Sequence, residues 1–82
     1  CLNILQDIFS SKKIRVNSVS PGGILTKENK IDKYFINKYI SDVPLKRLAK
    51  IDDIVSSVIF LASEEASYIN GHNLVIDGGK TC

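Results

Sequence analysis

Residues 14–26 read IRVNSVSPGGILT, and this stretch decides the fold. Branched apolar residues alternate with Arg15 and Asn17 over its first half, which is the pattern of a β-strand. Pro21 and the two glycines after it end such a strand, because proline cannot donate to a sheet and glycine adopts unusual backbone angles. We therefore predict a strand over residues 14–19 that runs into a Pro-Gly turn.

A second strand is predicted near the end of the sequence. Residues 74–76 are Leu-Val-Ile, a continuous apolar run that is typical of a strand covered on both faces. Residues 77–79, Asp-Gly-Gly, have the composition of a turn. We therefore expect a buried strand that also ends at a sharp turn.

Helical periodicity is found around these strands. Residues 51–63 carry apolar residues three or four positions apart, with Asp52 and Asp53 in the first turn, where carboxylates favour the positive end of a helix. Residues 2–9 show the same spacing over a shorter length. Two strands joined through a helix pair in parallel with a right-handed crossover. The predicted class is α/β, with two strands and flanking helices in one domain over residues 1–82.

Residues 27–44 form a different kind of segment. They are polar and rich in lysine, with aromatic residues interleaved, and Pro44 interrupts the pattern. This composition predicts one or two short helices on a mobile segment.

Composition argues against several classes of protein. The chain has 82 residues and a net charge of +2, and its lysines form no concentrated basic patch of the kind that nucleic acid needs. Its apolar runs are too short to span a membrane. His72 is the only histidine, and Cys1 and Cys82 have no nearby partner, so neither a metal site nor a disulfide framework is expected. We expect a cytoplasmic protein with free thiols, and a start at cysteine indicates that residues are missing upstream.

Five short motifs follow one another along the chain. They are Arg-Val-Asn at 15–17, Pro-Gly at 21–22, Pro-Leu-x-Arg-Leu at 44–48, Phe-Leu-Ala-Ser at 60–63 and Gly-x-x-Leu-Val-x-Asp-Gly-Gly at 71–79. In this order and spacing, the chain resembles the C-terminal third of a short-chain dehydrogenase/reductase. The resemblance implies the C-terminal part of a Rossmann-type, doubly wound parallel sheet. It also implies an NAD(P)-dependent oxidoreductase that transfers hydride between nicotinamide and an alcohol or ketone.

In that family the Pro-Gly turn lies beside the nicotinamide, in line with the rule that open α/β sheets bind ligands at the carboxyl ends of their strands. The resemblance implies that Pro21 and Gly22 form a wall against the ring and that Ile24 offers its backbone N–H and C=O to the carboxamide. Thr26 would place its hydroxyl near the carboxamide or the pyrophosphate. The implied cofactor is NAD or NADP, bound weakly or not at all by this chain alone. The alternative is a strand-ending turn without a ligand.

The resemblance also makes residues 27–44 the substrate loop, a segment that carries specificity in many enzymes. Tyr34, Phe35 and Tyr39 are the candidates to face a small-molecule substrate. The alternative interpretation is that these rings pack the short helices onto the body of the fold.

Tyr34 and Lys38 match the Tyr-x-x-x-Lys spacing of the family's catalytic pair. On a helix this spacing puts the ammonium one turn from the phenol, where it can lower the phenol's pKa. The family's pair precedes the Arg-Val-Asn motif, however, and this match follows it. We interpret it as a chance match and predict no catalytic residue in this chain.

Three other polar residues have structural interpretations. His72 is expected on the surface or in a hydrogen bond, and Asn17 is expected to bond backbone groups. Arg47 is expected to tie the loop to the helix that follows it.

The motifs that are missing limit the expected activity. The sequence contains no counterpart of the family's glycine-rich turn, its catalytic serine or its correctly placed Tyr-Lys pair. We therefore expect the C-terminal segment of an oxidoreductase, inactive on its own. The alternative is a non-enzymatic module that self-associates or docks onto another subunit. In either case the helix over residues 51–63 and the strand over residues 74–76 are expected to form a homo-oligomer contact.

Overall fold

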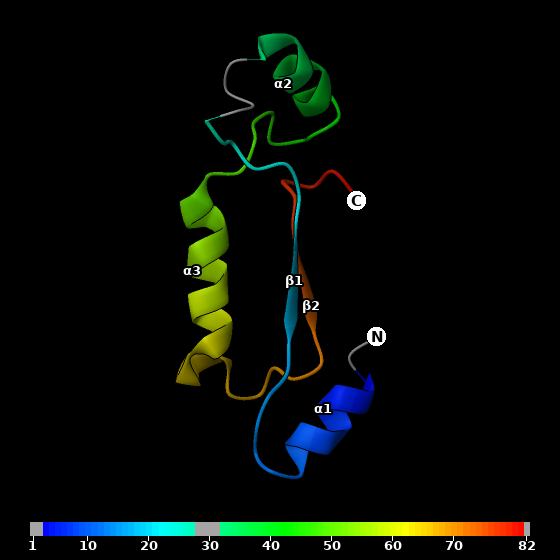
Figure 1. The fold of residues 1–82 in the computed structure, drawn as a ribbon, viewed down its shortest axis with the longest axis vertical. Helices are drawn as coiled ribbons and strands as arrows, with labels where there is room; N and C mark the ends of the chain where they lie inside the picture. The colour runs from blue at the N-terminus through cyan, green and yellow to red at the C-terminus, as the bar shows by residue number, and fades with distance from the viewer. Residues whose placement is uncertain (1–2, 28–31, 82) are drawn as a thin grey trace.

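Figure 1 shows the computed structural model of the chain, which describes residues 3–27 and 32–81. The long helix runs beside two strands, and the two shorter helices lie beyond opposite ends of the strands (Figure 1). The elements follow in the order α1 (Asn3–Ser10), β1 (Ser18–Pro21), α2 (Lys33–Ile40), α3 (Ile51–Ala62), the 3-10 helix η2 (Glu64–Ala66) and β2 (Asn73–Ile76).

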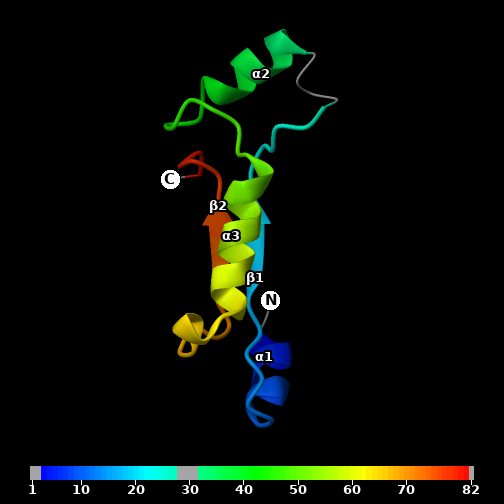
Figure 2. The same ribbon diagram turned by 90° about the vertical axis from the view of Figure 1, so that its left-hand side faces the viewer.

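β1 and β2 form a two-stranded parallel sheet. The register pairs Ser18 with Asn73 at one end and Pro21 with Ile76 at the other. The connection between the strands includes α3, which lies along one face of the sheet (Figure 1 and Figure 2). Strands that run in the same direction need such a crossover. The predicted α/β class with a parallel strand pair is confirmed.

β1 is shorter than the strand predicted over residues 14–19. Residues 14–17 precede the point where β2 begins, so no described strand lies beside them. The Val16 N–H instead donates to Asn70 Oδ1 at 3.0 Å, and the Val16 carbonyl accepts from the Gly71 N–H at 2.8 Å. The prediction was wrong for residues 14–17, because their described backbone bonds go to α1, through Ile14, and to the loop before β2, through Val16.

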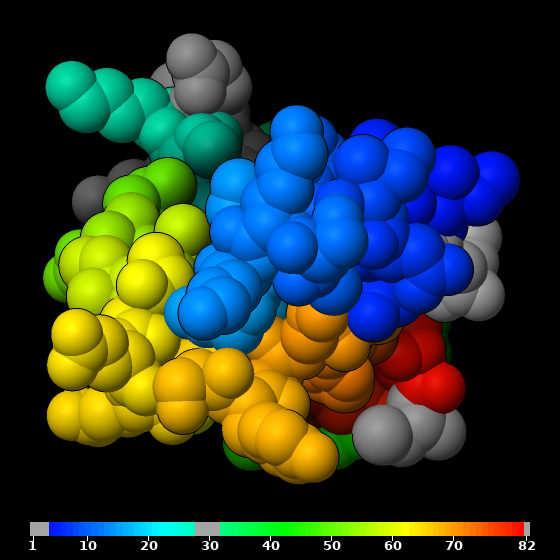
Figure 3. All heavy atoms as spheres, turned by 90° about the horizontal axis from the view of Figure 1, so that it is seen from below, coloured from blue at the N-terminus to red at the C-terminus, as the bar shows by residue number. Residues whose placement is uncertain are grey.

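Two polar side chains hold this entry segment against the loop before β2. The Arg15 guanidinium donates to the carbonyls of Ser63 at 3.1 Å and Ile69 at 3.2 Å. The Asn17 amide donates to the Ile69 carbonyl at 3.0 Å and accepts from the His72 N–H at 2.9 Å. Figure 3 views this end of the molecule, where the chain after α1 (light blue) lies against that loop (orange). The predicted role of Asn17 in bonding backbone groups is confirmed.

Asp53 fixes the start of α3. Its Oδ2 atom accepts from the Lys50 N–H at 2.8 Å and lies 2.9 Å from Arg47 Nη1. A carboxylate in the first turn that bonds the N-cap N–H stabilises the beginning of a helix. The ion pair also ties the preceding loop to α3, as predicted for Arg47.

The buried core of the described residues is small. It consists of Val43, Leu48, Leu61 and Ala66. The molecule measures 49 × 21 × 19 Å, and so elongated a shape has little interior. Val75 of β2 is 48% exposed. The prediction that this strand is covered on both faces is wrong for the described residues, because α3 covers only one face of the sheet.

Every helix within residues 3–27 and 32–81 is too short or too polar to span a membrane.

We predict that Asn17→Ala destabilises the native protein, because it deprives the His72 N–H of its acceptor. The free energy of unfolding should fall by about 1–3 kcal/mol, measured by urea denaturation. Asn37→Ala, at an exposed position on α2, is the matched control. It should change the value by less than about 0.5 kcal/mol. Equal effects of the two substitutions would contradict the proposed role of the Asn17 contacts.

Candidate functional site

The carboxyl ends of β1 and β2 meet at one edge of the sheet. One further ladder bond follows β1, since the Gly22 N–H donates to the Ile76 carbonyl at 2.9 Å. Open α/β sheets bind ligands outside this edge, where strands give way to loops. The turn after β1 and the turn after β2 are therefore the first candidates for the walls of a site.

The two turns touch at Gly22. A Cβ atom on this residue would lie 2.9 Å from the Asp77 Cβ and 3.0 Å from the Asp77 Cα. These distances are well below the optimal separation of about 3.5–4.0 Å between carbon atoms. Only glycine therefore fits at this position without a shift of the chain after β2.

Residues 23–25 continue in an extended form beyond the turn. The Gly23 carbonyl accepts from the Ala49 N–H at 2.9 Å, and the Leu25 N–H donates to the Ala49 carbonyl at 2.8 Å. These bonds make Ile24 and Ala49 an isolated parallel bridge. In a parallel ladder the peptide groups of the middle residue point away from its partner. The Ile24 backbone is therefore held in a fixed direction, away from Ala49.

α2 is one regular helix with a cap at its start. The Asp32 carboxylate accepts from the Phe35 N–H at 2.9 Å, which satisfies one of the donors that a helix leaves unpaired. The helix ends at Ile40. A single helix thus occupies the segment predicted to hold one or two, and residues 28–31 of that segment lie outside the described residues.

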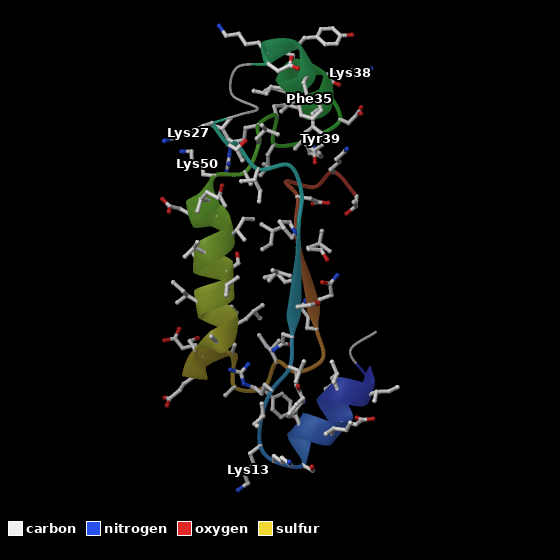
Figure 4. The ribbon with its side chains drawn as sticks, viewed as in Figure 1. Lys13, Lys27, Phe35, Lys38, Tyr39 and Lys50 are labelled. Carbon is white, nitrogen blue, oxygen red and sulfur yellow. The ribbon has the colours of Figure 1, made fainter. Side chains whose placement is uncertain are left out.

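Tyr39 connects α2 to the turn after β1. Its hydroxyl accepts from the Gly23 N–H at 2.8 Å, and Figure 4 shows its side chain on the side of α2 that faces the ends of the strands. The Phe35 ring stacks on it with 6.3 Å between the centroids. Lys80 Nζ lies 4.2 Å from the centroid of the Tyr39 ring, a distance at which the ring attracts a cation. α2, the turn after β1 and the loop after β2 therefore meet at Tyr39.

Tyr34 and Lys38, the match to Tyr-x-x-x-Lys, lie on the outside of α2. Tyr34 is 78% exposed, and Lys38 is exposed as well. Figure 4 shows Lys38 pointing away from the ends of the strands. Both side chains face solvent in this structure.

A cavity of about 230 Å³ lies at the edge described above and is lined by Gly23, Tyr39 and Asp77, among others. A larger cavity, of about 560 Å³, lies between β1 and α3, with Val19 and Val58 among its walls. Of these two, the smaller cavity adjoins the carboxyl ends of the strands.

Asp77 organises the turn after β2. Its carboxylate accepts from the Thr81 hydroxyl at 2.7 Å and from the N–H groups of Gly79 and Thr81, each at 3.0 Å. These bonds, that of the Thr81 hydroxyl above all, hold the pKa of the Asp77 carboxyl below its usual range. Gly78 and Gly79 have φ values of 65° and 94°, which glycine adopts without strain. The predicted Asp-Gly-Gly turn is confirmed.

The residues expected to contact a cofactor all fall within residues 21–26, at the carboxyl edge. They are Pro21, Gly22, Ile24 and Thr26. Of the expected substrate-loop residues, Tyr39 bonds this segment through Gly23, and Phe35 contacts Tyr39. Within the described part of the chain, no group of three or more His, Cys, Asp or Glu side chains could hold a metal ion.

Two contacts were not predicted from the sequence: the one between Gly23 and Tyr39, and the position of Lys80 above the Tyr39 ring. The available signal was the second glycine of the turn, because a glycine beside a strand often marks a close approach to the backbone. No signal in the sequence pointed to Lys80.

The chain is similar in sequence to known reductases. Residues 7–81 match a family model described as enoyl-(acyl carrier protein) reductase. The chain is 46% identical over 71 residues to the 3-oxoacyl-(acyl-carrier-protein) reductase FabG of Buchnera aphidicola, a match that covers 85% of this chain and 29% of that protein.

Solved structures resemble the chain in both fold and sequence. A 4-hydroxyisoleucine dehydrogenase complexed with NADH has a TM-score of 0.85 and 36% identity, over 98% of this chain and 35% of its own. A mutant short-chain dehydrogenase/reductase from Serratia marcescens has a TM-score of 0.89 and 29% identity, over 95% of this chain and 32% of its own. The chain thus spans roughly a third of the length of the proteins it is similar to.

We predict that Thr81→Val raises the pKa of Asp77 toward the ordinary carboxylate value of about 3.9, because the hydroxyl donor is lost. A depressed folded-state pKa stabilises the fold above the unfolded value, and this contribution disappears as the pH falls through the folded pKa. The variant should therefore lose more stability at neutral pH than at about pH 3. Carbon NMR titration of the Asp77 carboxyl measures the shift. Thr81→Ser keeps the hydroxyl and should keep the low pKa; a low pKa in Thr81→Val would contradict the assignment.

Proposed function

Because the chain belongs to the short-chain dehydrogenase/reductase family, we propose that it is the carboxy-terminal part of a nicotinamide-dependent oxidoreductase. The whole enzyme would transfer hydride between the nicotinamide ring and an alcohol or ketone carbon of a small molecule. The observation that carries the proposal is the turn at the carboxyl edge, where Pro21 and Gly22 present backbone beside the end of β2. The proposal includes a cytoplasmic location. The lack of a disulfide framework in the sequence agrees with it.

The wall formed by this turn suits a flat ring. Gly22 has no side chain, and packing against Asp77 leaves no room for one on that side. The Ile24 peptide groups are held in one direction by the bridge to Ala49. A backbone N–H and C=O together match the acceptor and donor of a carboxamide. These residues would orient the ring so that one face is presented to the substrate.

The proposed cofactor is NAD or NADP, which supplies or accepts the hydride when bound. Thr26 follows the wall by two residues and would bond the carboxamide or the pyrophosphate through its hydroxyl. The chain's own contribution is to position one end of the cofactor. The remaining contacts would come from residues outside these 82.

We place the substrate beside α2, with Tyr34, Phe35 and Tyr39 as the substrate-loop residues. Phe35 is half exposed and stacks on Tyr39, so the two rings form one apolar surface next to the turn. Tyr34 lies on the same helix and is more exposed. An apolar surface at this place favours substrates with an apolar portion near the reacting carbon.

The 82 residues by themselves are not expected to catalyse hydride transfer. The sequence contains neither the family's glycine-rich turn nor a Tyr-Lys pair before the Arg-Val-Asn motif. The Tyr34 and Lys38 side chains face solvent on α2. Activity is therefore assigned to the whole enzyme.

α3 and β2 are also proposed to contribute to a homo-oligomer contact. Ile51, Ile59 and Phe60 of α3 are 56%, 63% and 44% exposed, and Val75 of β2 is 48% exposed. The exposed side of α3 and the uncovered face of β2 each offer apolar area that a contact with another subunit would bury. The same observation supports the second candidate function, a non-enzymatic module that self-associates or docks onto a subunit. A nicotinamide-dependent activity of the native protein distinguishes the first candidate from the second.

We predict that Thr26→Val raises the KM for the dinucleotide by about 3- to 10-fold in the native enzyme, because one hydrogen bond is lost. Hydride transfer is followed through the absorbance of the reduced nicotinamide. Thr26→Ser keeps the hydroxyl and should change KM by less than about twofold. Equal losses in both variants would show that the hydroxyl does not contact the cofactor, and no hydride transfer by the unsubstituted protein would refute the enzyme proposal.

We predict that Ile59→Asp shifts the native protein to a smaller assembly, because it places a charge within the apolar surface of α3. The mass is measured by light scattering at micromolar concentration. Asn37→Asp adds the same charge at an exposed position of α2 and should leave the mass unchanged. An unchanged assembly in Ile59→Asp would contradict the use of this surface as a contact.

A further inference from the structure

A side-chain hydrogen bond of Tyr39 joins α2 to the turn after β1. The phenol oxygen accepts from the Gly23 N–H at 2.8 Å, and the side chain is only partly exposed. Figure 4 shows it pointing from the helix toward the strands, with Phe35 beside it and Lys38 turned away. Tyr39 therefore links the proposed substrate loop, to which it belongs, to the proposed cofactor wall.

The ring lies directly over Gly23. A Cβ atom on Gly23 would be 2.7 Å from Tyr39 Cε1 and 2.8 Å from Tyr39 Cζ, so that any side chain at position 23 would overlap the ring. Gly23 is not among the residues with positive φ. The need for glycine here is explained by the space that Tyr39 and Leu48 take, the latter 2.9 Å from such a Cβ, and not by an unusual backbone angle.

Two further contacts fix the ring from other sides. Phe35, one helical turn earlier, stacks on it at an interplanar angle of 28°. Lys80, which follows the Asp-Gly-Gly turn, places its ammonium 4.2 Å from the ring centroid. The ring is thus held by its own helix, by the turn after β1 and by the loop after β2.

We propose that Tyr39 is a positioning residue, which sets the Gly22–Gly23 backbone against the nicotinamide by accepting the Gly23 N–H. The inference rests on the proposed function, because it concerns the wall for that ring. The residue acts through the backbone of its neighbours: moving the turn moves the Ile24 peptide groups, which directly follow Gly23. The hydroxyl is the part of the side chain that carries this role, whereas the ring fills the space above the glycine.

The test is Tyr39→Phe in the native full-length enzyme. This change keeps the ring over Gly23, the stacking on Phe35 and the face beneath Lys80, and removes only the acceptor. The loss of one hydrogen bond should reduce protection of the Gly23 amide against hydrogen exchange by about 3- to 10-fold. The kcat should fall by a similar factor of about 3 to 10, while the KM for the dinucleotide changes by less than about twofold. The orientation of the nicotinamide ring affects the geometry of hydride transfer more than it affects how tightly the rest of the dinucleotide binds.

Tyr68→Phe is the matched control, because it makes the same chemical change on a fully exposed side chain. It should leave the Gly23 exchange rate, kcat and KM as they are. Unchanged kcat in Tyr39→Phe, together with reduced amide protection, would overturn the positioning role while leaving the enzyme proposal intact. No hydride transfer by the unsubstituted protein would overturn the enzyme proposal and this inference with it.

A second pair of variants tests the packing without an activity assay. Gly23→Ala should lower the midpoint temperature of unfolding when Tyr39 is present. In the Tyr39→Ala background it should lower this temperature less, because the smaller side chain makes room for the added methyl group. Coupling between the two positions supports the contact. Additive effects would show that the ring does not rest on Gly23.

Discussion

The parallel register of β1 and β2 is the constraint on which the rest of the structure depends. It places Ser18 beside Asn73 at one end and Pro21 beside Ile76 at the other. A shift by one residue would turn every side chain of a strand to the opposite face. It would also separate Asn17 from the His72 N–H, with which it shares a 2.9 Å bond just before the ladder begins. One set of backbone bonds thus defines both ends of the sheet: the end at Ser18 and Asn73, and the open edge at the carboxyl ends of the strands.

The open edge is built from glycines that serve different physical purposes. Gly22 and Gly23 are needed for space, since a Cβ on either would strike Asp77 or Tyr39. Gly78 is needed for both conformation and space, because its φ of 65° is costly for most other residues and a Cβ on it would lie 2.9 Å from Val43 Cγ1. The missing side chains of these glycines and the positive φ of Gly78 together let the turn after β1 contact the turn after β2. The result is a backbone surface to which a flat ligand can come close.

The exposed apolar surface has the same origin as the small core. Two short strands and one long helix enclose little volume, so Val43 and Leu61 are buried while Ile59 and Val75 are 63% and 48% exposed. Hydrophobic burial is the main favourable contribution to folding, and little of it is available here. A chain with this surface gains stability from whatever covers α3 and the uncovered face of β2. The proposed parent enzyme and the proposed oligomer contact are both consistent with that need.

Local patterns in the sequence determined much of the fold. The helix over residues 51–63 was predicted within one residue of α3, because the spacing of its apolar residues and the acidic first turn are properties of the helix alone. The Asp-Gly-Gly turn was predictable for the same reason, since glycine acts on the backbone where it stands. β1 itself runs to Pro21, beyond the predicted end at Val19. The segment that carries Pro21, Gly22, Ile24 and Thr26 could be singled out from its motif and its place after a strand.

Only the tertiary structure decided which distant residues meet. Residues 14–17 have the alternation of a strand, but no described strand pairs with them, because β2 begins too late in the register. Tyr39 and Lys80 lie far apart in the sequence, and their contact depends on how α2 and the loop after β2 fold over the same turn. The glycine at position 23 is visible in the sequence, but its reason, the ring of Tyr39 above it, exists only in the folded chain. Local backbone preferences act over a few residues, whereas close approach depends on the path of the entire chain.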